Sequence, residues 1–114
     1  MTQAEIKQLI QKQRTFFHSD ATLDVEYRIH ALQKLKACIL KYENEINIAI
    51  RADLGKCAFE SYMCETGLVL SEISYMQRHL RSFAREKNVH TPLAQFHSRS
   101  FKKPSPYGVV LIMS

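Results

Sequence analysis

The stretch Pro104-Ser105-Pro106-Tyr107-Gly108-Val109-Val110-Leu111-Ile112-Met113-Ser114 decides the fold of this chain. Its two prolines and its glycine favour a turn, because proline fixes its own backbone and glycine admits conformations that are closed to other residues. The apolar run that follows, Val109 to Met113, is typical of a strand buried on both faces, the kind found inside parallel sheets. Such a strand is normally followed by a crossover helix and further strands. The pattern therefore predicts the opening of a larger α/β domain that is cut short.

The composition is that of a globular protein. Of the 114 residues, 46% are hydrophobic and 24% are charged. No stretch approaches the roughly 18 consecutive apolar residues that a membrane span needs, and the start of the chain lacks the apolar core of a signal peptide. Cys38, Cys57 and Cys64 make an odd count without a Cys-x-x-Cys pair, which fits reduced thiols in the cytosol. We therefore expect a cytoplasmic protein without a membrane span.

The net charge of +5 raises the question of an anionic partner. Most lysines and arginines are interleaved with acidic residues, as on a solvated helix face. The only basic cluster is small and consists of Arg99, Lys102 and Lys103. Base-stacking aromatic residues are not regularly interleaved with the basic ones, so we predict no nucleic acid partner.

The first helix is predicted from Thr2 to His18. Thr2 and Glu5 fit a capping box, in which the hydroxyl and the carboxylate satisfy exposed N–H groups of the first turn. Apolar residues then recur at helical spacing, at Ile6, Leu9, Ile10 and Phe17. The polar stretch after this helix offers Asp20 or Thr22 as the cap of the next one.

The second helical stretch is predicted from this cap to Leu54, where Gly55 supplies the stop. Its apolar residues recur every three or four positions: Val25, Ile29, Leu32, Leu35, Ile39, Tyr42, Ile46, Ala49 and Ile50. An unbroken helix of this length exceeds the usual globular range, so we expect a break near Tyr42-Glu43-Asn44. A two-stranded coiled coil is the rival explanation of the pattern, although the flanking charges show no regular alternation.

The third helical stretch is predicted from Ala58 to Lys87. One side of it carries Phe59, Tyr62, Met63, Leu70, Ile73, Met76, Leu80 and Phe83. Leu68, Val69 and Tyr75 add apolar surface on other sides. More than one neighbouring element is therefore expected to cover the middle of this helix.

The character of the chain changes after Asn88. Pro92 cannot continue a helix comfortably, because it lacks a backbone donor and restricts the residue before it. From Gln95 to Lys103 the apolar and polar residues alternate weakly. This pattern therefore predicts that residues 89–103 form an extended segment or an edge strand.

No complete active site is recognisable among the residues that usually carry chemistry. Cys38 lies in the middle of a predicted helix, and Cys57 and Cys64 are too far apart along a helix to chelate one metal ion comfortably. The five histidines form no His-Glu-x-x-His pattern: His18, His30, His79, His90 and His97. We therefore predict neither a catalytic residue nor a metal site within the chain.

The glycines do not predict a nucleotide-binding loop either. Gly55, Gly67 and Gly108 are the only ones, and they are widely separated. A phosphate-cradling loop such as Gly-x-Gly-x-x-Gly needs several closely spaced glycines. These residues alone cannot build such a loop.

The order of five short segments is more informative than any single residue. The segments are Gln13-Arg14-Thr15-Phe16-Phe17, Tyr27-Arg28-Ile29-His30-Ala31-Leu32, Ala52-Asp53-Leu54-Gly55-Lys56, Glu72-Ile73-Ser74-Tyr75-Met76 and Pro106-Tyr107-Gly108-Val109-Val110-Leu111-Ile112. In this order they resemble the amino-terminal part of a class 3 type aldehyde dehydrogenase, and the similarity covers essentially the whole chain. Each motif is modest, but five in series make a chance similarity improbable.

The resemblance implies the α/β fold of the aldehyde dehydrogenases. It divides the chain into a helical region, residues 1–88, an extended segment or edge strand, residues 89–103, and a third part, residues 104–114. That third part corresponds to the turn and first strand of a truncated, Rossmann-like cofactor-binding domain. Met113 and Ser114 match backbone positions that border the cofactor in that family.

The resemblance also implies a reaction, the oxidation of an aldehyde to a carboxylate with NAD or NADP. In the family a cysteine thiolate attacks the carbonyl, hydride leaves to the nicotinamide, and water hydrolyses the thioester. The family's nucleophile, base and oxyanion donor all correspond to positions beyond residue 114, so we expect residues 1–114 alone to be inactive. The parent enzyme is expected to be a homo-oligomer, and the shorter chain is able to self-associate.

The alternative is a small basic helical module that binds a protein partner and catalyses nothing. The two hypotheses differ in the terminal apolar run, Val109 to Met113. A module must bury this run with its own helices or with another copy. If the chain is instead one part of a larger enzyme, the run lacks the other strands of its sheet and is exposed.

Overall fold

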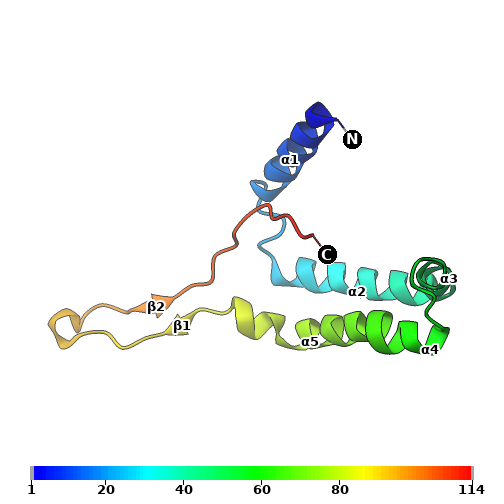
Figure 1. Cartoon of the computed structure of the whole chain (residues 1–114). Helices are drawn as coiled ribbons and strands as arrows, with labels where there is room; N and C mark the ends of the chain where they lie inside the picture. Colours follow the sequence, from blue (N-terminus) through cyan, green and yellow to red (C-terminus); the bar gives the residue numbers. More distant parts are fainter. Residues whose placement is uncertain (1, 114) are drawn as a thin grey trace. The chain divides into compact units, whose positions relative to one another are not determined.

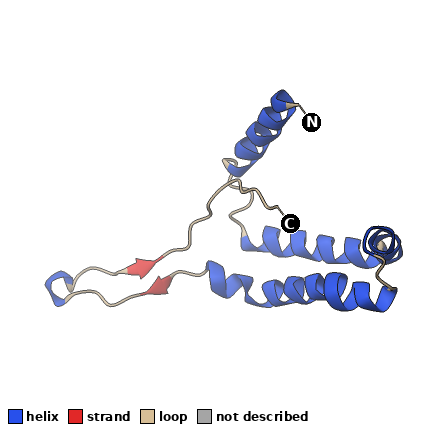
Figure 2. Ribbon diagram, in the orientation of Figure 1, coloured by secondary structure: helices blue, strands red, loops and turns tan. Residues whose placement is uncertain are grey.

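A computed structural model describes residues 2–113. Helices dominate this range and the strands are short, as Figure 1 and Figure 2 show. The elements follow one another as α1 (Gln3–Phe17), α2 (Val25–Lys41), α3 (Glu43–Leu54), α4 (Ala58–Ser61), the π-helix η1 (Tyr62–Thr66), α5 (Gly67–Ala84), β1 (Lys87–Asn88), the 3-10 helix η2 (Leu93–Gln95) and β2 (Phe101–Lys102). The prediction of a mainly helical chain with an extended segment is confirmed. No helix in this range is long and apolar enough to cross a membrane.

Contacts group the chain into two compact units. One unit is Arg28–Leu80, and the other joins the residues up to Tyr27 to those from Arg81 onward. The first unit contains the buried apolar side chains of the described residues, which are Ile29, Ile73 and Leu80. The second contains α1, the two strands and the carboxyl-terminal segment.

The capping box predicted at the start of α1 is present. The backbone N–H of Thr2 donates to the Glu5 carboxylate at 2.7 Å, and the backbone N–H of Glu5 donates to the Thr2 hydroxyl at 3.3 Å. These bonds satisfy donors that a helix start otherwise leaves open. The helix ends at Phe17 with His18 as its C-cap, within one residue of the predicted bounds.

The cap of α2 is Asp24, so the prediction of Asp20 or Thr22 is wrong. The backbone N–H groups of Glu26 and Tyr27 both donate to the Asp24 carboxylate, each at 3.1 Å. Asp20 instead has a φ of 60° and lies in the turn between α1 and α2. Aspartate tolerates this left-handed conformation better than most residues, because its short side chain can bond locally. The turn extends further than the apolar pattern indicates, and the helix begins later.

Replacing Asp24 with alanine is expected to lower the free energy of unfolding by about 1 kcal/mol, because two backbone donors of α2 lose their acceptor. Urea unfolding followed by far-ultraviolet circular dichroism measures the change. Asp53→Ala, in the last turn of α3, is the matched control and is expected to change the value by less than about 0.5 kcal/mol. Equal losses in the two variants would contradict the capping role.

The break and the stop predicted in the second helical stretch are both confirmed. α2 ends at Lys41 and α3 begins at Glu43, with Tyr42 between them. α3 ends at Leu54, and its C-cap is Gly55, whose φ of 69° is left-handed and whose N–H donates to the carbonyl of Arg51 at 3.0 Å. Glycine takes this conformation without the steric cost of a side chain.

α2 and α5 lie side by side and antiparallel (Figure 1). Near the middle of α2, the Lys36 ammonium group donates to the Ser74 hydroxyl at 2.9 Å. Near its start, Glu26 accepts from Arg81. Residue numbers therefore fall along α5 as they rise along α2. Because α2 has a partner helix within its own chain, the coiled-coil explanation of its apolar pattern is not needed.

The third helical stretch contains a π-turn that the sequence pattern did not predict. Helix α4 leads directly into η1, and η1 leads into α5 at Gly67. The N–H of Gly67 donates to the carbonyl of Tyr62, the bond that closes this wider turn. α5 ends at Ala84 and not at the predicted Lys87, because Lys87 is part of the strand β1.

The predicted extended segment forms a hairpin. β1 and β2 pair antiparallel, with Lys87 opposite Lys102 and Asn88 opposite Phe101. Each strand has only two residues, and the 3-10 helix η2 lies in the long connection between them. The sheet therefore begins just before residues 89–103, and its second strand lies within them.

Residues 109–113 do not form the strand that their apolar pattern predicts. No described residue pairs with this segment, and a strand needs a neighbour to bond to its backbone. Leu111, Ile112 and Met113 expose 81%, 85% and 86% of their surface. Within residues 2–113 the segment is thus an apolar run without a sheet.

Candidate functional site

The sequence placed the cofactor contacts at Met113 and Ser114. Met113 is almost fully exposed, and Ser114 lies outside the described residues. Gly55 ends α3, Gly67 stands within a helical stretch and Gly108 precedes the exposed segment, so the glycines do not form a phosphate loop. The described residues alone therefore do not fit a dinucleotide.

The three cysteines are separate from one another along the described chain. Cys38, Cys57 and Cys64 are exposed free thiols. A nucleophilic cysteine usually has a base or another activating group beside it, and no hydrogen bond in residues 2–113 joins one of these thiols to a histidine. The same range contains no group of three or more histidine, cysteine and acidic side chains placed to hold a metal ion.

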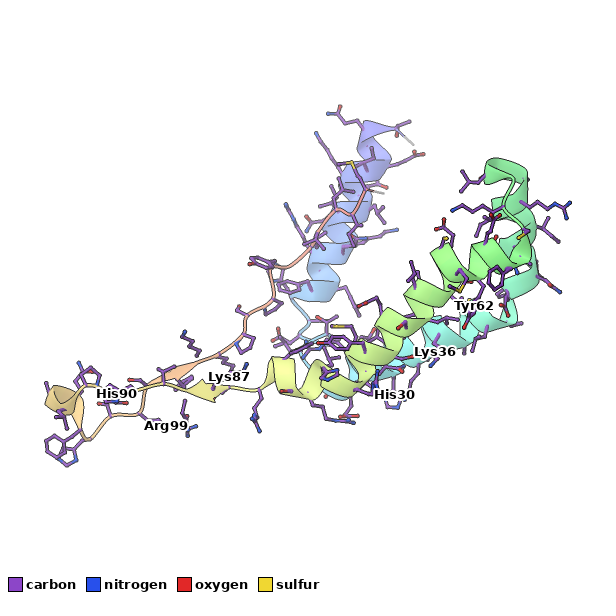
Figure 3. The ribbon with its side chains drawn as sticks, turned by 60° about the horizontal axis from the view of Figure 1, so that its bottom comes forward. His30, Lys36, Tyr62, Lys87, His90 and Arg99 are labelled. Atoms are coloured by element: carbon purple, nitrogen blue, oxygen red, sulfur yellow. The ribbon has the colours of Figure 1, made fainter. Side chains whose placement is uncertain are left out.

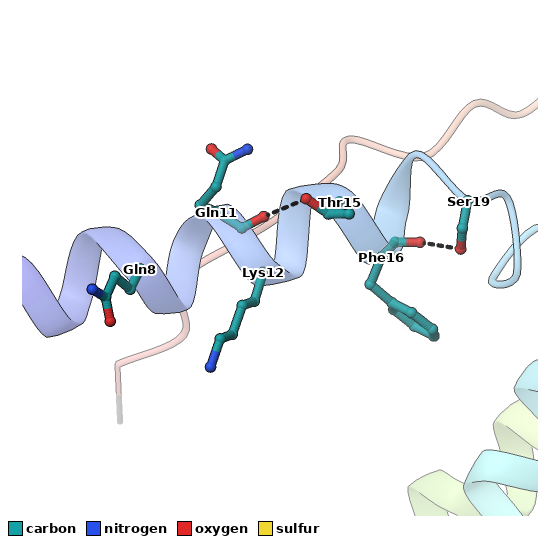
Figure 4. Close-up of a pocket in the computed structure, with 6 residues that line it drawn as sticks. All are labelled: Gln8, Gln11, Lys12, Thr15, Phe16 and Ser19. Atoms are coloured by element: carbon teal, nitrogen blue, oxygen red, sulfur yellow. Dashed lines mark hydrogen bonds between the residues drawn. The ribbon is translucent and has the colours of Figure 1, made fainter.

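A hollow of about 590 Å³ follows α1 and the turn after it (Figure 4). It is lined by Gln8, Gln11, Lys12, Thr15, Phe16 and Ser19. The Thr15 hydroxyl donates to the carbonyl of Gln11 at 3.0 Å, and the Ser19 hydroxyl donates to the carbonyl of Phe16 at 2.7 Å. Both hydroxyls thus bond to their own backbone. Because one helix supplies nearly the whole lining, the hollow is an open surface feature and not an enclosed cavity.

An ion pair joins Lys56, just after α3, to Glu65 in η1. Both side chains are partly buried. The hydrogen bond to Glu65 raises the pKa of Lys56 above its ordinary value, against a smaller opposing effect of desolvation. Because the pKa is raised, the stabilisation is complete while Lys56 is charged and is lost as the pH rises through that pKa. The pair fastens the α3–α4 corner to the π-turn.

A second ion pair joins α2 to α5. The Arg81 guanidinium donates through Nε and Nη2 to the two carboxylate oxygens of Glu26, at 2.8 and 2.9 Å. This hydrogen bonding raises the pKa of Arg81 above its ordinary value. The forked geometry joins the start of α2 to the last turn of α5. Like Lys56 and Glu65, these residues link elements of the fold.

Sequence reasoning missed both ion pairs. Glu26 and Arg81 are 55 positions apart, so no local pattern connects them. Lys56 and Glu65 are nine positions apart, and they meet because Gly55 turns the chain and the π-turn follows. In the sequence, Lys56 stands out only as the last residue of the segment Ala52-Asp53-Leu54-Gly55-Lys56.

Large apolar side chains are exposed along much of the described chain. They include Ile6, Leu9, Ile10 and Phe16 on α1; Leu68, Val69 and Tyr75 on α5; and Val110, Leu111, Ile112 and Met113 after the last turn. The prediction that α5 presents apolar surface on more than one side is confirmed, because Leu68 is 58% exposed and Val69 46%. Large apolar side chains exposed in such numbers favour a chain against which further protein packs.

Comparison with known proteins identifies the class to which these features correspond. The chain is 38% identical over 109 residues to the 4,4'-diaponeurosporen-aldehyde dehydrogenase of Staphylococcus aureus. The matched region covers 96% of this chain and 24% of that protein. It is 33% identical over 111 residues to a dimeric NADP-preferring aldehyde dehydrogenase of Canis lupus familiaris, and this match covers 96% of this chain and 24% of that protein. It is 32% identical over 108 residues to the 4,4'-diapolycopene-4,4'-dial dehydrogenase of Cytobacillus firmus, with 95% and 24% covered.

A solved structure gives the same result for the fold. The substrate-bound state of Staphylococcus aureus AldH superposes with a TM-score of 0.84 at 36% identity, over 94% of this chain and 23% of that one. No protein-family model matches the chain. The homologues are aldehyde dehydrogenases, and more narrowly class 3 enzymes of that family. The chain corresponds to their amino-terminal part and spans about a quarter of their length.

Proposed function

We propose that this chain is the amino-terminal part of an NAD- or NADP-dependent aldehyde dehydrogenase that oxidises aldehydes to carboxylates through a cysteine thioester. The observation that carries the proposal is the match to the Staphylococcus aureus enzyme along 96% of the chain. A cytoplasmic location and a homo-oligomeric parent enzyme are parts of the same proposal.

The helical region, residues 1–88, acts as a scaffold in this proposal. The ion pairs and the α2–α5 pairing hold it together, and the apolar faces of α1 and α5 receive the rest of the enzyme. Residues 89–103 form an arm outside the main sheet. Residues 104–114 lead into the Rossmann-like cofactor domain, where Met113 and Ser114 border the cofactor.

The exposed terminal run supports this proposal over the helical-module alternative. A self-sufficient module has to bury Val109 to Met113 with its own helices or with another copy. Leu111, Ile112 and Met113 each expose more than four fifths of their surface. Such exposure fits a strand whose neighbouring strands come from another part of an enzyme.

A chimaera tests the proposal. Residues 1–114 replace the matched quarter of the Staphylococcus aureus 4,4'-diaponeurosporen-aldehyde dehydrogenase, which retains its own remaining three quarters. We expect the chimaera to be soluble and to reduce NAD or NADP when an aldehyde is added, because the exposed faces of this chain are suited to that partner. Absorbance of the reduced nicotinamide follows the reaction.

Two controls make the result decisive. The Staphylococcus aureus enzyme without its matched quarter is expected to be inactive, and so is the 114-residue chain alone, which lacks a complete set of nucleophile, base and oxyanion donor. A soluble, folded chimaera without activity would contradict the proposal. Aldehyde oxidation by the 114-residue chain alone would contradict the assignment of the chemistry to the rest of the enzyme.

A further inference from the structure

Two hydroxyl groups are buried at the two ends of the π-turn, and neither has a hydrogen-bond partner within residues 2–113. Ser61 is the last residue of α4 and exposes none of its surface, and Thr66 is the last residue of η1 and exposes 6%. Tyr62, which is labelled in Figure 3, begins the turn between them. A buried polar group without a partner costs free energy, so almost all such groups in folded proteins bond to protein or to ordered water.

Both hydroxyls differ from other hydroxyls in the helices of this chain. Thr15 in α1 and Ser74 in α5 each donate to the carbonyl oxygen four residues earlier, at 3.0 and 2.7 Å. This local bond is the usual one for a serine or threonine inside a helix. Ser61 and Thr66 do not make it. Their hydroxyls therefore point to a partner other than the preceding turn of their own helix.

The π-turn places Ser61 and Thr66 one turn apart on the same side of the helix. The N–H of Gly67 donates to the carbonyl of Tyr62, so one turn here takes five residues. A Cβ atom at Gly67 would lie 3.3 Å from Cε1 of the Tyr62 ring, so a side chain in this turn lies beside the position five residues later. Ser61 and Thr66 are also five residues apart, and the Cα–Cβ bonds of a helix tilt toward its start. One small molecule can therefore bridge the two hydroxyls.

The burial of these two side chains excludes the rest of a larger enzyme as the partner. Asn47 and Gln77 also carry a side-chain atom without a hydrogen bond in residues 2–113, but both side chains are only partly buried, so further protein can reach them. Ser61 and Thr66 are already enclosed by this chain. Water donates and accepts hydrogen bonds, as two hydroxyls require, whereas a cation needs charged oxygen ligands that neither residue offers.

We propose that one water molecule is bound inside the chain between the hydroxyls of Ser61 and Thr66. The water connects the start of the π-turn to its end, and so favours this wider turn over an ordinary helical turn. It supplies hydrogen bonds that the two buried groups do not obtain from residues 2–113. The site is independent of the dehydrogenase function, because it requires neither a cofactor nor a reaction.

A double-mutant cycle tests the shared water. Ser61→Ala and Thr66→Val each leave the other hydroxyl buried with too few partners, and each is expected to raise the equilibrium constant of unfolding about tenfold. The S61A/T66V variant removes both hydroxyls and the need for the water. We therefore expect it to raise the constant about tenfold or less, and not by the product of about 100-fold. Urea unfolding of the 114-residue chain, followed by circular dichroism, measures the three constants.

Ser71→Ala and Thr15→Val are the matched controls. Ser71 on α5 and Thr15 on α1 are exposed, so the two variants make the same chemical changes away from the π-turn. Each is expected to change the equilibrium constant of unfolding by less than about threefold. The comparison with Ser71→Ala also cancels the preference of a helix for alanine over serine.

A crystal structure of the 114-residue chain, alone or within the chimaera, tests the site directly. We expect a water oxygen within about 3.2 Å of both hydroxyl oxygens. Hydroxyls that bond to each other, or to the carbonyls four residues earlier, with no water between them, would overturn the proposal. Single effects that multiply in the double variant would also overturn it, as would single variants more stable than the unmodified chain. If a variant does not fold, the crystal structure of the unmodified sequence decides.

Discussion

Gly67→Ala is expected to lower the free energy of unfolding of the chain by about 3 kcal/mol. A Cβ atom at Gly67 would lie 2.5 Å from the carbonyl oxygen of Tyr62 and 3.3 Å from Cε1 of its ring. The carbonyl oxygen belongs to the backbone of the π-turn, so it cannot move away without opening that turn. Alanine is favoured over glycine in a helix by about 1 kcal/mol, which offsets only part of the clash.

Gly55→Ala is the control that separates steric contact from backbone conformation. A Cβ atom at Gly55 meets nothing within 4 Å, but the φ of 69° is unfavourable for alanine. This conformation costs about 1 to 2 kcal/mol. Urea unfolding of the two variants, followed by circular dichroism, is expected to give a larger loss for Gly67→Ala. A smaller loss of unfolding free energy for Gly67→Ala than for Gly55→Ala would mean that the π-turn does not require a residue without a side chain at position 67.

The π-turn matters because it sets how the helices on either side of it face their neighbours. A π-turn adds one residue to a helical turn and so rotates everything that follows relative to what precedes it. Lys56, which precedes the turn, pairs with Glu65 inside it. After it, Ser74 accepts from Lys36, and Ile73 and Leu80 are buried. The turn therefore lets one helical stretch satisfy the α3–α4 corner and the α2–α5 pairing together.

Local signals in the sequence predicted the helix ends that depend on neighbouring residues. The Thr2–Glu5 box, the break at Tyr42 and the stop at Gly55 are all decided within a few positions. The cap of α2 was missed for a local reason as well, since Asp20 competes with Asp24 and only the geometry of the turn separates them.

Features that depend on distant residues were not predictable in the same way. The π-turn left one signal, a glycine inside a strongly apolar helical pattern, but glycine alone does not specify a wider turn. The Glu26–Arg81 pair left none. Residues 109–113 carry a clear strand pattern, yet no strand forms because the described residues contain no neighbouring strand. Cofactor contacts at Met113 and Ser114 stay a prediction for the same reason.

Ile73→Ala is expected to lower the free energy of unfolding by about 3 kcal/mol. Ile73 lies in α5 with only 5% of its surface exposed, and just two other apolar side chains of the described residues, Ile29 and Leu80, are buried as fully. Truncation removes buried methyl and methylene groups and leaves a cavity that neighbouring side chains fill only in part. Because so few apolar groups are fully buried, one of them contributes a large share of the total stability.

Ile48→Ala is the matched control for Ile73→Ala. It makes the same chemical change on α3, at a side chain that is 70% exposed, and is expected to alter the free energy of unfolding by less than about 0.5 kcal/mol. Urea unfolding measures both variants in the 114-residue chain and again in the chimaera with the Staphylococcus aureus enzyme. A buried core at Ile73 predicts a large loss in both settings. Similar small losses for Ile73→Ala and Ile48→Ala would instead mean that the α2–α5 contact contributes little to the free energy of unfolding. The stability of the fold would then depend on the exposed apolar faces, which pack against the rest of the enzyme.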